Sequence, residues 1–179
     1  MLPELVVFYI LNYEGSPMVC YIDALAKNLY SILYYNNHIR FTSIFNKNWL
    51  GWNACREVID EYGKELVKLC GRLMKILSVN LGLSEEVLQN AFGGEDIGAC
   101  LRVNYYPKCP QPDLTLGLSS HSDPGGMTLL LPDNQVTGLQ VRKDNKWITV
   151  KPARHAFIVN IGDQIQVTPL VSLFLFIYI

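Results

Sequence analysis

The stretch "GLSSHSDPGGMTLLL" (Gly117–Leu131) is the part of the sequence that decides the fold. It places His121 and Asp123 one residue apart, before a Pro-Gly-Gly turn and an apolar run. Side chains two residues apart in a strand point to the same face, so at a strand end both could reach one metal ion. An isolated His-x-Asp pattern is weak evidence, because an aspartate that caps the turn before Pro124 explains it equally well.

Short candidate strands surround this stretch. The run "ACLRVNYYP" alternates apolar and polar positions, with Arg102, Asn104 and Tyr106 on one face. Turn-forming clusters, "PDNQVTG" and "KDNK", separate several of the later runs. The pattern predicts an antiparallel sandwich or barrel. The further candidate strands are Leu116–Ser120, Met127–Leu131, Gly138–Arg142, Trp147–Val150 and Ala156–Ile161.

A long helix is predicted ahead of these strands. From about Asn53 to Gly82, apolar residues recur at spacings of three and four, and the charged residues fall largely on the other side. Ser84 is the expected N-cap of a short helix that ends at about Phe92, before Gly93. Residues 1–51 are rich in Tyr, Ile, Asn and Leu but hold no helical or strand period, and no role is assigned to them.

Composition bounds the classes of function. The chain has 179 residues, 17% of them charged, and a formal net charge of −1, so bulk electrostatics give no reason to expect nucleic-acid binding. Five cysteines without a Cys-x-x-Cys pair fit reduced thiols in the cytoplasm better than a disulfide framework. Neither apolar end is read as a membrane segment. The N-terminal end lacks the basic region and the cleavage site of a signal peptide, and the C-terminal "VSLFLFIYI" is far shorter than the ~20 residues that a spanning helix needs.

The run "LRVNYYPKCPQPDLTLGLSSHSDPGGMTLLLPDNQVTGLQVRKDNKWITVKP", with "AFIVNIGDQIQ" after it, resembles the plant 2-oxoglutarate/Fe(II)-dependent dioxygenases. It is most similar to the branch of jasmonate-induced oxygenases and anthocyanidin-synthase-like enzymes. The resemblance implies an α+β fold, in which N-terminal helices precede an incomplete double-stranded β-helix (jelly-roll) core. It also implies oxidation of a small jasmonate- or flavonoid-like substrate by O₂. Fe(II) and 2-oxoglutarate would serve that reaction, with ascorbate as reductant.

The same resemblance divides the chain and assigns residues. Residues 1–53 are unmatched, 54–96 form a helical segment, and 97–179 form the dioxygenase domain, with a divergent end from 167. His121 and Asp123 would be the iron ligands, and Asn104 and Tyr106 would hold 2-oxoglutarate. Arg102 would pair with a substrate carboxylate, although an exposed strand charge is an equal alternative.

The second histidine of the family would fall near residues 178 and 179, where this sequence has Tyr and Ile. His155 matches a loop position and is expected at the surface. The arginine and serine that grip the far carboxylate of 2-oxoglutarate also have no counterpart, so we expect little turnover from this chain. Alternative interpretations are a non-catalytic binding remnant, an interaction module with an incidental His-x-Asp, or a gene-model fragment that diverges after Gln166.

Overall fold

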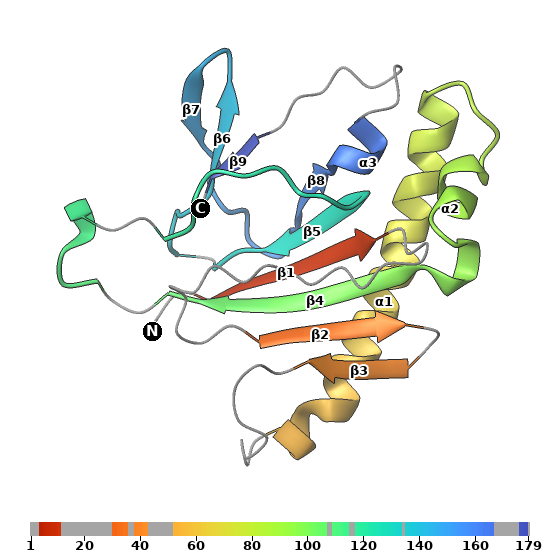
Figure 1. The fold of residues 1–179 in the computed structure, drawn as a ribbon, viewed down its shortest axis with the longest axis horizontal. Helices are drawn as coiled ribbons and strands as arrows, with labels where there is room; N and C mark the ends of the chain where they lie inside the picture. Colours follow the sequence, from red (N-terminus) through yellow and green to blue (C-terminus); the bar gives the residue numbers. More distant parts are fainter. Residues whose placement is uncertain are drawn as a thin grey trace.

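The computed structural model describes residues 4–11, 30–35, 38–42, 52–106, 109–114, 117–133, 135–166 and 176–178. Its strands form two antiparallel sheets, shown in Figure 1. The larger has the order β3-β2-β4-β1-β5-β8, and the smaller has the order β7-β6-β9. The strands are β1 (Glu4–Leu11), β2 (Tyr30–Tyr35), β3 (His38–Thr42), β4 (Gly98–Tyr105), β5 (Met127–Leu131), β6 (Gln140–Lys143), β7 (Lys146–Thr149), β8 (Ile158–Ile161) and β9 (Phe176–Tyr178).

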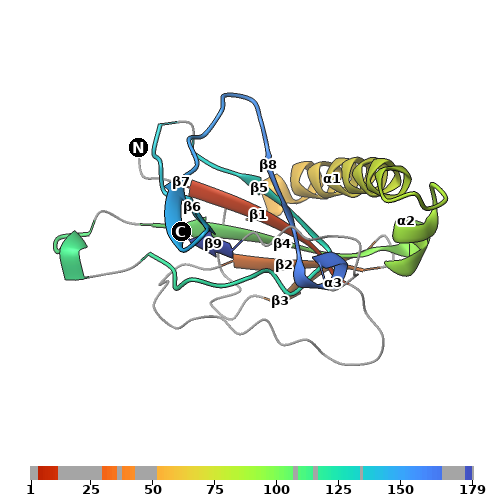
Figure 2. The ribbon, with the colours of Figure 1, turned by 90° about the horizontal axis from the view of Figure 1, so that it is seen from above.

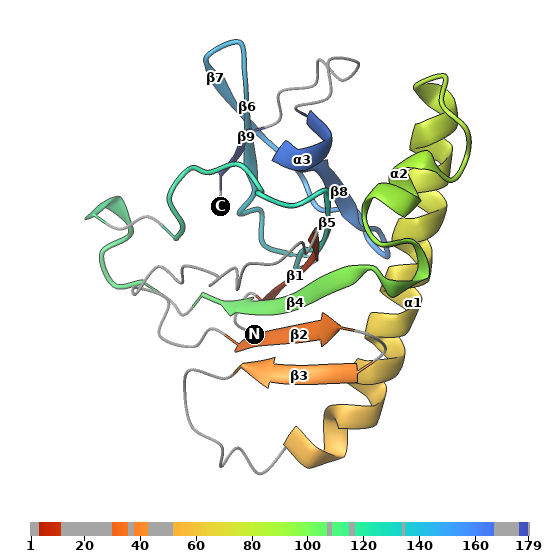
Figure 3. The ribbon, with the colours of Figure 1, turned by 45° about the vertical axis from the view of Figure 1, so that its right-hand side comes forward.

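The predicted long helix is α1 (Trp52–Asn80), which lies on one face of the larger sheet (Figures 2 and 3). Its buried positions recur every four residues, as an amphipathic helix requires, at Leu66, Cys70 and Met74. They form one core with buried residues of β4 and β5: Ala99, Leu101, Met127 and Leu129. The helix therefore fixes which face of β4 and β5 packs into this core. None of the described helices combines the length and the apolar character needed to cross a bilayer.

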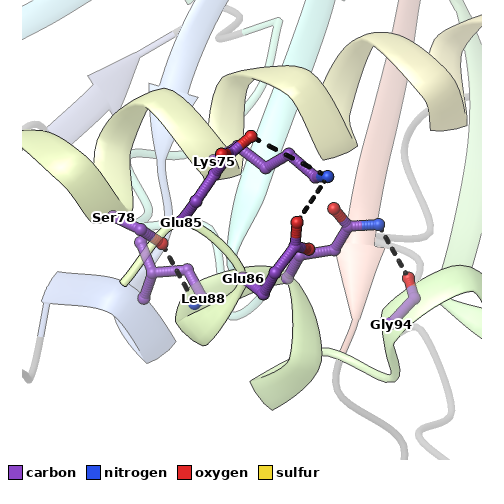
Figure 4. Close-up of polar contacts among 7 residues, drawn as sticks. Lys75, Ser78, Glu85, Glu86, Leu88 and Gly94 are labelled. Atoms are coloured by element: carbon purple, nitrogen blue, oxygen red, sulfur yellow. Dashed lines mark hydrogen bonds and ion pairs between the residues drawn. The ribbon is translucent and has the colours of Figure 1, made fainter. Parts of the chain in front are cut away.

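A short helix, α2 (Val87–Ala91), packs against the end of α1 (Figure 4). Ser78 is fully buried, and its hydroxyl oxygen accepts a hydrogen bond from the backbone N–H of Leu88 at 3.1 Å. On the exposed side, Lys75 pairs with Glu86 at 2.7 Å. A side chain of α1 thus satisfies a backbone donor of α2 at a buried junction.

The expectation that Ser84 is the N-cap of this helix is wrong. The N-cap is Glu86, and it makes no side-chain cap bond. The backbone carbonyl of Ser84 instead accepts from the N–H of Val87 at 3.1 Å, so a turn precedes the helix. The helix does end where expected, and Gly93 adopts the left-handed conformation with φ 100° that glycine tolerates.

The second face of the larger sheet carries Arg102. Val7 of β1 pairs with Arg102 on one side and with Leu130 on the other, and directly paired residues point to the same face. Leu130 packs with Leu139 in a separate core from that of α1. Tyr106 also contacts this second core. The chain is therefore layered, with α1 on one side of the larger sheet and the connections of the smaller sheet on the other.

Most candidate strands after residue 97 are confirmed. β5 has the predicted bounds, and β6, β7 and β8 each begin or end within two residues of prediction. The strand predicted at Leu116–Ser120 is wrong in its described part, because residues 117–120 are irregular. Three strands, β1, β2 and β3, occur where no period was found, and β1 lies centrally between β4 and β5. Apolar runs with no alternation can form strands that are buried on both faces, which a period-two search does not detect.

Candidate metal centre

His121 and Asp123 lie in the connection that precedes β5. They do not form the strand end that was expected, since only His121 makes an isolated bridge and residues 122–126 are irregular. Their side chains nevertheless converge, with Nε2 of His121 3.6 Å from Oδ1 of Asp123. Two donors that each lie about 2.1 Å from a shared ion are at most about 4.2 Å apart, so this separation can accommodate one. The His121 side chain is 32% exposed and that of Asp123 is 3% exposed, which gives the pair one open side.

The ring of His121 is oriented by its own loop. Nδ1 lies 2.9 Å from the backbone carbonyl of Ser119. A carbonyl oxygen can only accept, so this contact places the proton on Nδ1 and leaves the lone pair of Nε2 directed toward Asp123. A histidine that donates one ring N–H to a carbonyl and presents the other nitrogen is the arrangement found in metal sites.

The carboxylate of Asp123 is fixed from the opposite side. The hydroxyl of Thr128 donates to Oδ2 at 2.7 Å, and both residues are buried. Burial raises the pKa of Asp123 above its ordinary value, and the Thr128 hydrogen bond is the largest influence that lowers it again. The positive charge of the His121 ring, when that ring is protonated, also lowers this pKa. Oδ2 is thereby engaged by the protein, while Oδ1 faces the histidine.

Asn160 completes the buried surroundings of Asp123. It is opposite Thr128 in the β5–β8 register and only 1% exposed. Its amide is near enough to Asp123 to lower the pKa of the carboxylate. Its contact falls short of hydrogen-bond geometry, so within the described part of the chain both amide atoms are buried without a hydrogen-bond partner. Such a group is costly unless something polar meets it.

The donor set can be compared with what iron requires. An imidazole nitrogen and a carboxylate oxygen are two members of the two-histidine, one-carboxylate triad that holds non-haem Fe(II). Among the described residues, no group of three or more His, Cys, Asp or Glu side chains could hold a metal ion. His155 is exposed in a turn with φ 58°, as expected for a surface histidine. The residues present therefore fit two positions of such a site.

Arg102, Asn104 and Tyr106 form a second polar group. Burial raises the pKa of Tyr106, while a hydrogen bond with Asn104 and the charge of Arg102 both lower it, so the three side chains lie close together. Asn104 is 3% exposed, and its amide oxygen has no hydrogen-bond partner within the described residues. Arg102 and Asn104 share the sheet face of Thr128. Val7 of β1 pairs with Arg102 on one side and with Leu130 on the other, and residues two apart in a strand point to the same face.

Sequence reasoning missed the residues that orient the pair. Thr128 is the one polar residue in the apolar strand "MTLLL", and such a residue inside a buried run needs a partner, which was a usable signal. Asn160 and Asp163 belong to the "NIGD" run, which contributed to the resemblance but received no role. Nothing in the local pattern indicates that this run approaches the His-x-Asp loop, because the approach is a tertiary contact.

Comparison with known proteins gives a consistent family. Residues 97–170 match the 2OG-Fe(II) oxygenase superfamily. Jasmonate-induced oxygenase 2 of Arabidopsis thaliana is 79% identical over 112 residues, which are 63% of this chain and 30% of the relative. Jasmonate-induced oxygenase 1 of the same plant is 62% identical over 162 residues, or 87% of this chain and 39% of the relative. The chain thus spans about a third of the length of the curated relatives it matches.

Solved structures agree. The crystal structure of JOX2 in complex with 2OG, Fe and JA is 59% identical, with a TM-score of 0.74 over 84% of this chain and 44% of that chain. A full-length Neurospora crassa protein in complex with alpha-KG and 5-formyluracil gives a TM-score of 0.70 over 84% of this chain and 50% of that chain, at 18% identity, which shows the fold alone. The expected fold class, α+β with part of a double-stranded β-helix, is confirmed.

Proposed function

Residues 97–170 belong to the 2OG-Fe(II) oxygenase superfamily, and from this premise we propose that the chain forms the iron-binding part of a plant 2-oxoglutarate-dependent oxygenase. The observation that carries the proposal is the 3.6 Å approach of His121 Nε2 to Asp123 Oδ1. The second ring nitrogen of His121, Nδ1, contacts the backbone carbonyl of Ser119. The second carboxylate oxygen of Asp123, Oδ2, accepts a hydrogen bond from the hydroxyl of Thr128. An incidental His-x-Asp turn has no reason to hold both side chains in this way.

His121 and Asp123 are the proposed iron ligands. When bound, Fe(II) would supply the activation of O₂ that side chains alone do not provide. The part played by the chain is to hold one neutral imidazole and one carboxylate on the same side, with the remaining positions left for co-substrate and O₂. Ascorbate is the proposed reductant that keeps the iron ferrous.

Asn104 and Tyr106 are the proposed contacts to 2-oxoglutarate. An amide and a phenol can each donate a hydrogen bond to a carboxylate oxygen. Asn104 lies near the end of β4 on the sheet face of Thr128, and Tyr106 follows directly after that strand. The amide oxygen of Asn104 is buried without a hydrogen-bond partner within the described residues, so a polar ligand at this position would relieve a desolvation cost.

Arg102 is the proposed contact to a carboxylate on the organic substrate. A guanidinium binds a carboxylate through two parallel hydrogen bonds, and Arg102 is half-buried beside Asn104 and Tyr106. The JOX2 structure holds JA, whereas naringenin,2-oxoglutarate 3-dioxygenase of Callistephus chinensis is 53% identical over 114 residues. A guanidinium at this position favours an acidic, jasmonate-like substrate over a neutral flavonoid-like one.

The cytoplasm is the proposed location. Cys70 is a buried free thiol, and Cys109 is a partly exposed one. Unpaired cysteines are the usual state in a reducing compartment. The proposed partners are the small organic substrate and O₂.

Metal titration of the purified chain tests the iron site. Binding of Mn²⁺ or Co²⁺ under anaerobic conditions, followed by calorimetry, is expected for the unaltered chain and lost in His121→Ala and in Asp123→Ala. His155→Ala is the matched control, because it removes an exposed histidine outside the site. Metal binding that survives both ligand substitutions would overturn the proposal.

A second titration tests the substrate class. With Mn²⁺ and 2-oxoglutarate present, jasmonic acid is expected to bind more tightly than naringenin, and Arg102→Gln is expected to remove this preference. Arg142→Gln removes an exposed arginine on β6, where it lies over the Trp147 ring, and is the control. Tighter binding of naringenin, or an unchanged preference in Arg102→Gln, would contradict the carboxylate role. Succinate formation in separate aerobic mixtures, with Fe(II) and ascorbate in place of Mn²⁺, measures how much turnover the chain retains.

A further inference from the structure

We propose that Asp163 is a positioning residue for the His121–Asp123 pair, an inference that rests on the proposed metal site. Asp163 is 41 positions from Ser122 in the sequence and lies in α3 (Asp163–Gln166), directly after β8. Both its side chain and its backbone form hydrogen bonds to the loop that carries His121 and Asp123. Figure 1 shows α3 beside the start of β5, where that loop ends.

The side-chain contact is to the residue between the two ligands. The hydroxyl of Ser122 donates to Oδ2 of Asp163 at 2.9 Å, and the contact is partly buried. A hydrogen bond to an ionised acceptor is stronger than one between neutral groups. Because Ser122 separates His121 from Asp123, fixing its side chain limits how far either ligand can rotate from the other.

The backbone contact is to a ligand itself. The N–H of Asp163 donates to the carbonyl oxygen of Asp123 at 2.8 Å. The first N–H groups of a helix have no acceptor within the helix, and in α3 they donate to backbone carbonyls of the loop. One residue therefore grips Asp123 through its main chain and Ser122 through its side chain.

Neighbouring residues extend the same contact. Gly162 N–H donates to the carbonyl of Gly126 at 2.8 Å, and Gln164 N–H donates to the carbonyl of Gly125 at 3.2 Å. A Cβ at Gly162 would lie 2.1 Å from the Gly125 oxygen, so this approach admits only glycine. The turn after β8 and the His-x-Asp loop are thus locked together by main-chain bonds.

This contact matters because the loop has little other support. Residues 122–126 belong to no strand, so no ladder of sheet hydrogen bonds fixes their backbone. The hydrogen bond from Thr128 fixes the carboxylate of Asp123, but it does not fix the backbone between His121 and Asp123. Ligands that move by a fraction of an ångström from their best positions bind a metal less tightly. Residues that form hydrogen bonds to metal ligands typically contribute 10- to 100-fold in metal affinity.

The test compares metal affinity in full-chain variants that keep both ligands. Ser122→Ala removes the donor, Asp163→Ala removes the acceptor, and Asp163→Asn keeps an acceptor oxygen. Asp60→Ala is the matched control, because Asp60 is also partly exposed and accepts one hydrogen bond, from Lys64 at 2.7 Å, on a distant part of α1. The readouts are the Mn²⁺ dissociation constant by calorimetry and the amide hydrogen exchange of residues 162–164 without metal.

We expect Ser122→Ala and Asp163→Ala each to weaken Mn²⁺ binding about tenfold or more, with faster exchange at residues 162–164. The double variant should bind no more weakly than the worse single variant, because one interaction is lost in all three. Asp163→Asn should retain most of the affinity, and Asp60→Ala all of it. Unchanged affinity in both alanine variants would overturn the positioning role, provided that Asp123→Ala still abolishes binding. If the unaltered chain binds no metal, the proposed function fails first, and this role fails with it.

Discussion

The ring of Phe92 fills the space into which any side chain at position 126 would project. An ideal Cβ at Gly126 would lie 2.4 Å from Cε1 of that ring. Phe92 is buried at the end of α2, and Gly126 closes the loop that carries His121 and Asp123. The helical layer thereby sets the position of the metal-binding loop through one aromatic side chain.

Gly126→Ala should destabilise the chain, because the ring or the loop has to move to admit the methyl group. Overpacking of this kind costs about 1–3 kcal/mol of unfolding free energy. Gly138→Ala is the control, since nothing lies within 4 Å of a Cβ there. Urea unfolding of both variants measures the difference. Equal stabilities would mean that Phe92 can turn aside without cost.

Thr128→Val should destabilise the chain in a pH-dependent way. The substitution keeps the side-chain shape but leaves Oδ2 of buried Asp123 without its donor, at a cost of about 1–3 kcal/mol. The lost hydrogen bond lowers the pKa of Asp123, so it stabilises the ionised carboxylate. The loss should therefore be largest at pH 8 and shrink as the pH falls through the pKa of Asp123. Urea unfolding across this range measures it, and a loss that is constant with pH would contradict this reasoning.

Ser78→Ala should weaken the junction of α1 and α2. It removes the buried acceptor of the Leu88 N–H, and a buried donor left without a partner costs about 1–3 kcal/mol. Lys75→Met provides the comparison, because the exposed pair of Lys75 with Glu86 contributes less than a buried bond (Figure 4). Thermal unfolding of the two variants ranks them. A larger effect at Lys75 would be inconsistent with this ranking.

The parts of the fold that repeat a local period could be predicted from the sequence. Apolar residues at spacings of three and four between about Asn53 and Gly82 indicated α1, and the apolar run Met127–Leu131 predicted β5 with its observed bounds. β1 was missed because seven of its eight residues, "ELVVFYIL", are apolar without alternation, as in a strand with neighbours on both sides. Its pairing with β4 and β5 is set by long-range contacts that no local pattern encodes.

The candidate metal site also has parts that the sequence predicts and parts that it does not. His121 and Asp123 were predictable because donor type and spacing are local properties of the chain. The loop geometry was not, since we expected a strand end and residues 122–126 are irregular. Asp163 lies 41 positions from Ser122, so its contact arises only when β8 pairs with β5. Such orienting contacts are tertiary, which is why sequence spacing did not reveal them.

Asp123→Asn should stabilise the metal-free chain while weakening metal binding. Burial raises the folded-state pKa of Asp123 above its ordinary value of 3.8. An acid whose folded-state pKa is raised contributes stability that is fully present below its unfolded-state pKa. This contribution is lost as the pH rises through the folded-state pKa. At pH 8 the unaltered chain has lost this contribution, whereas the neutral amide of Asn has no charge to bury. The variant should therefore be the more stable protein at pH 8, with the difference narrowing toward pH 4.

Urea unfolding in EDTA measures that difference, and addition of Mn²⁺ should reverse the order. A metal that binds only the folded state stabilises it by RT ln(1 + [L]/Kd), and the unaltered chain should gain more because it keeps the carboxylate. If Asp123→Asn were instead less stable in EDTA at pH 8, the hydrogen bond from Thr128 would outweigh the desolvation of the charge. The raised pKa of Asp123 favours the first outcome, because burial is the largest influence on it and the neighbouring charge of Asp163 raises it further, against the lowering by Thr128, His121 and Asn160. A buried carboxylate that costs stability without metal is what a site organised for a cation should contain.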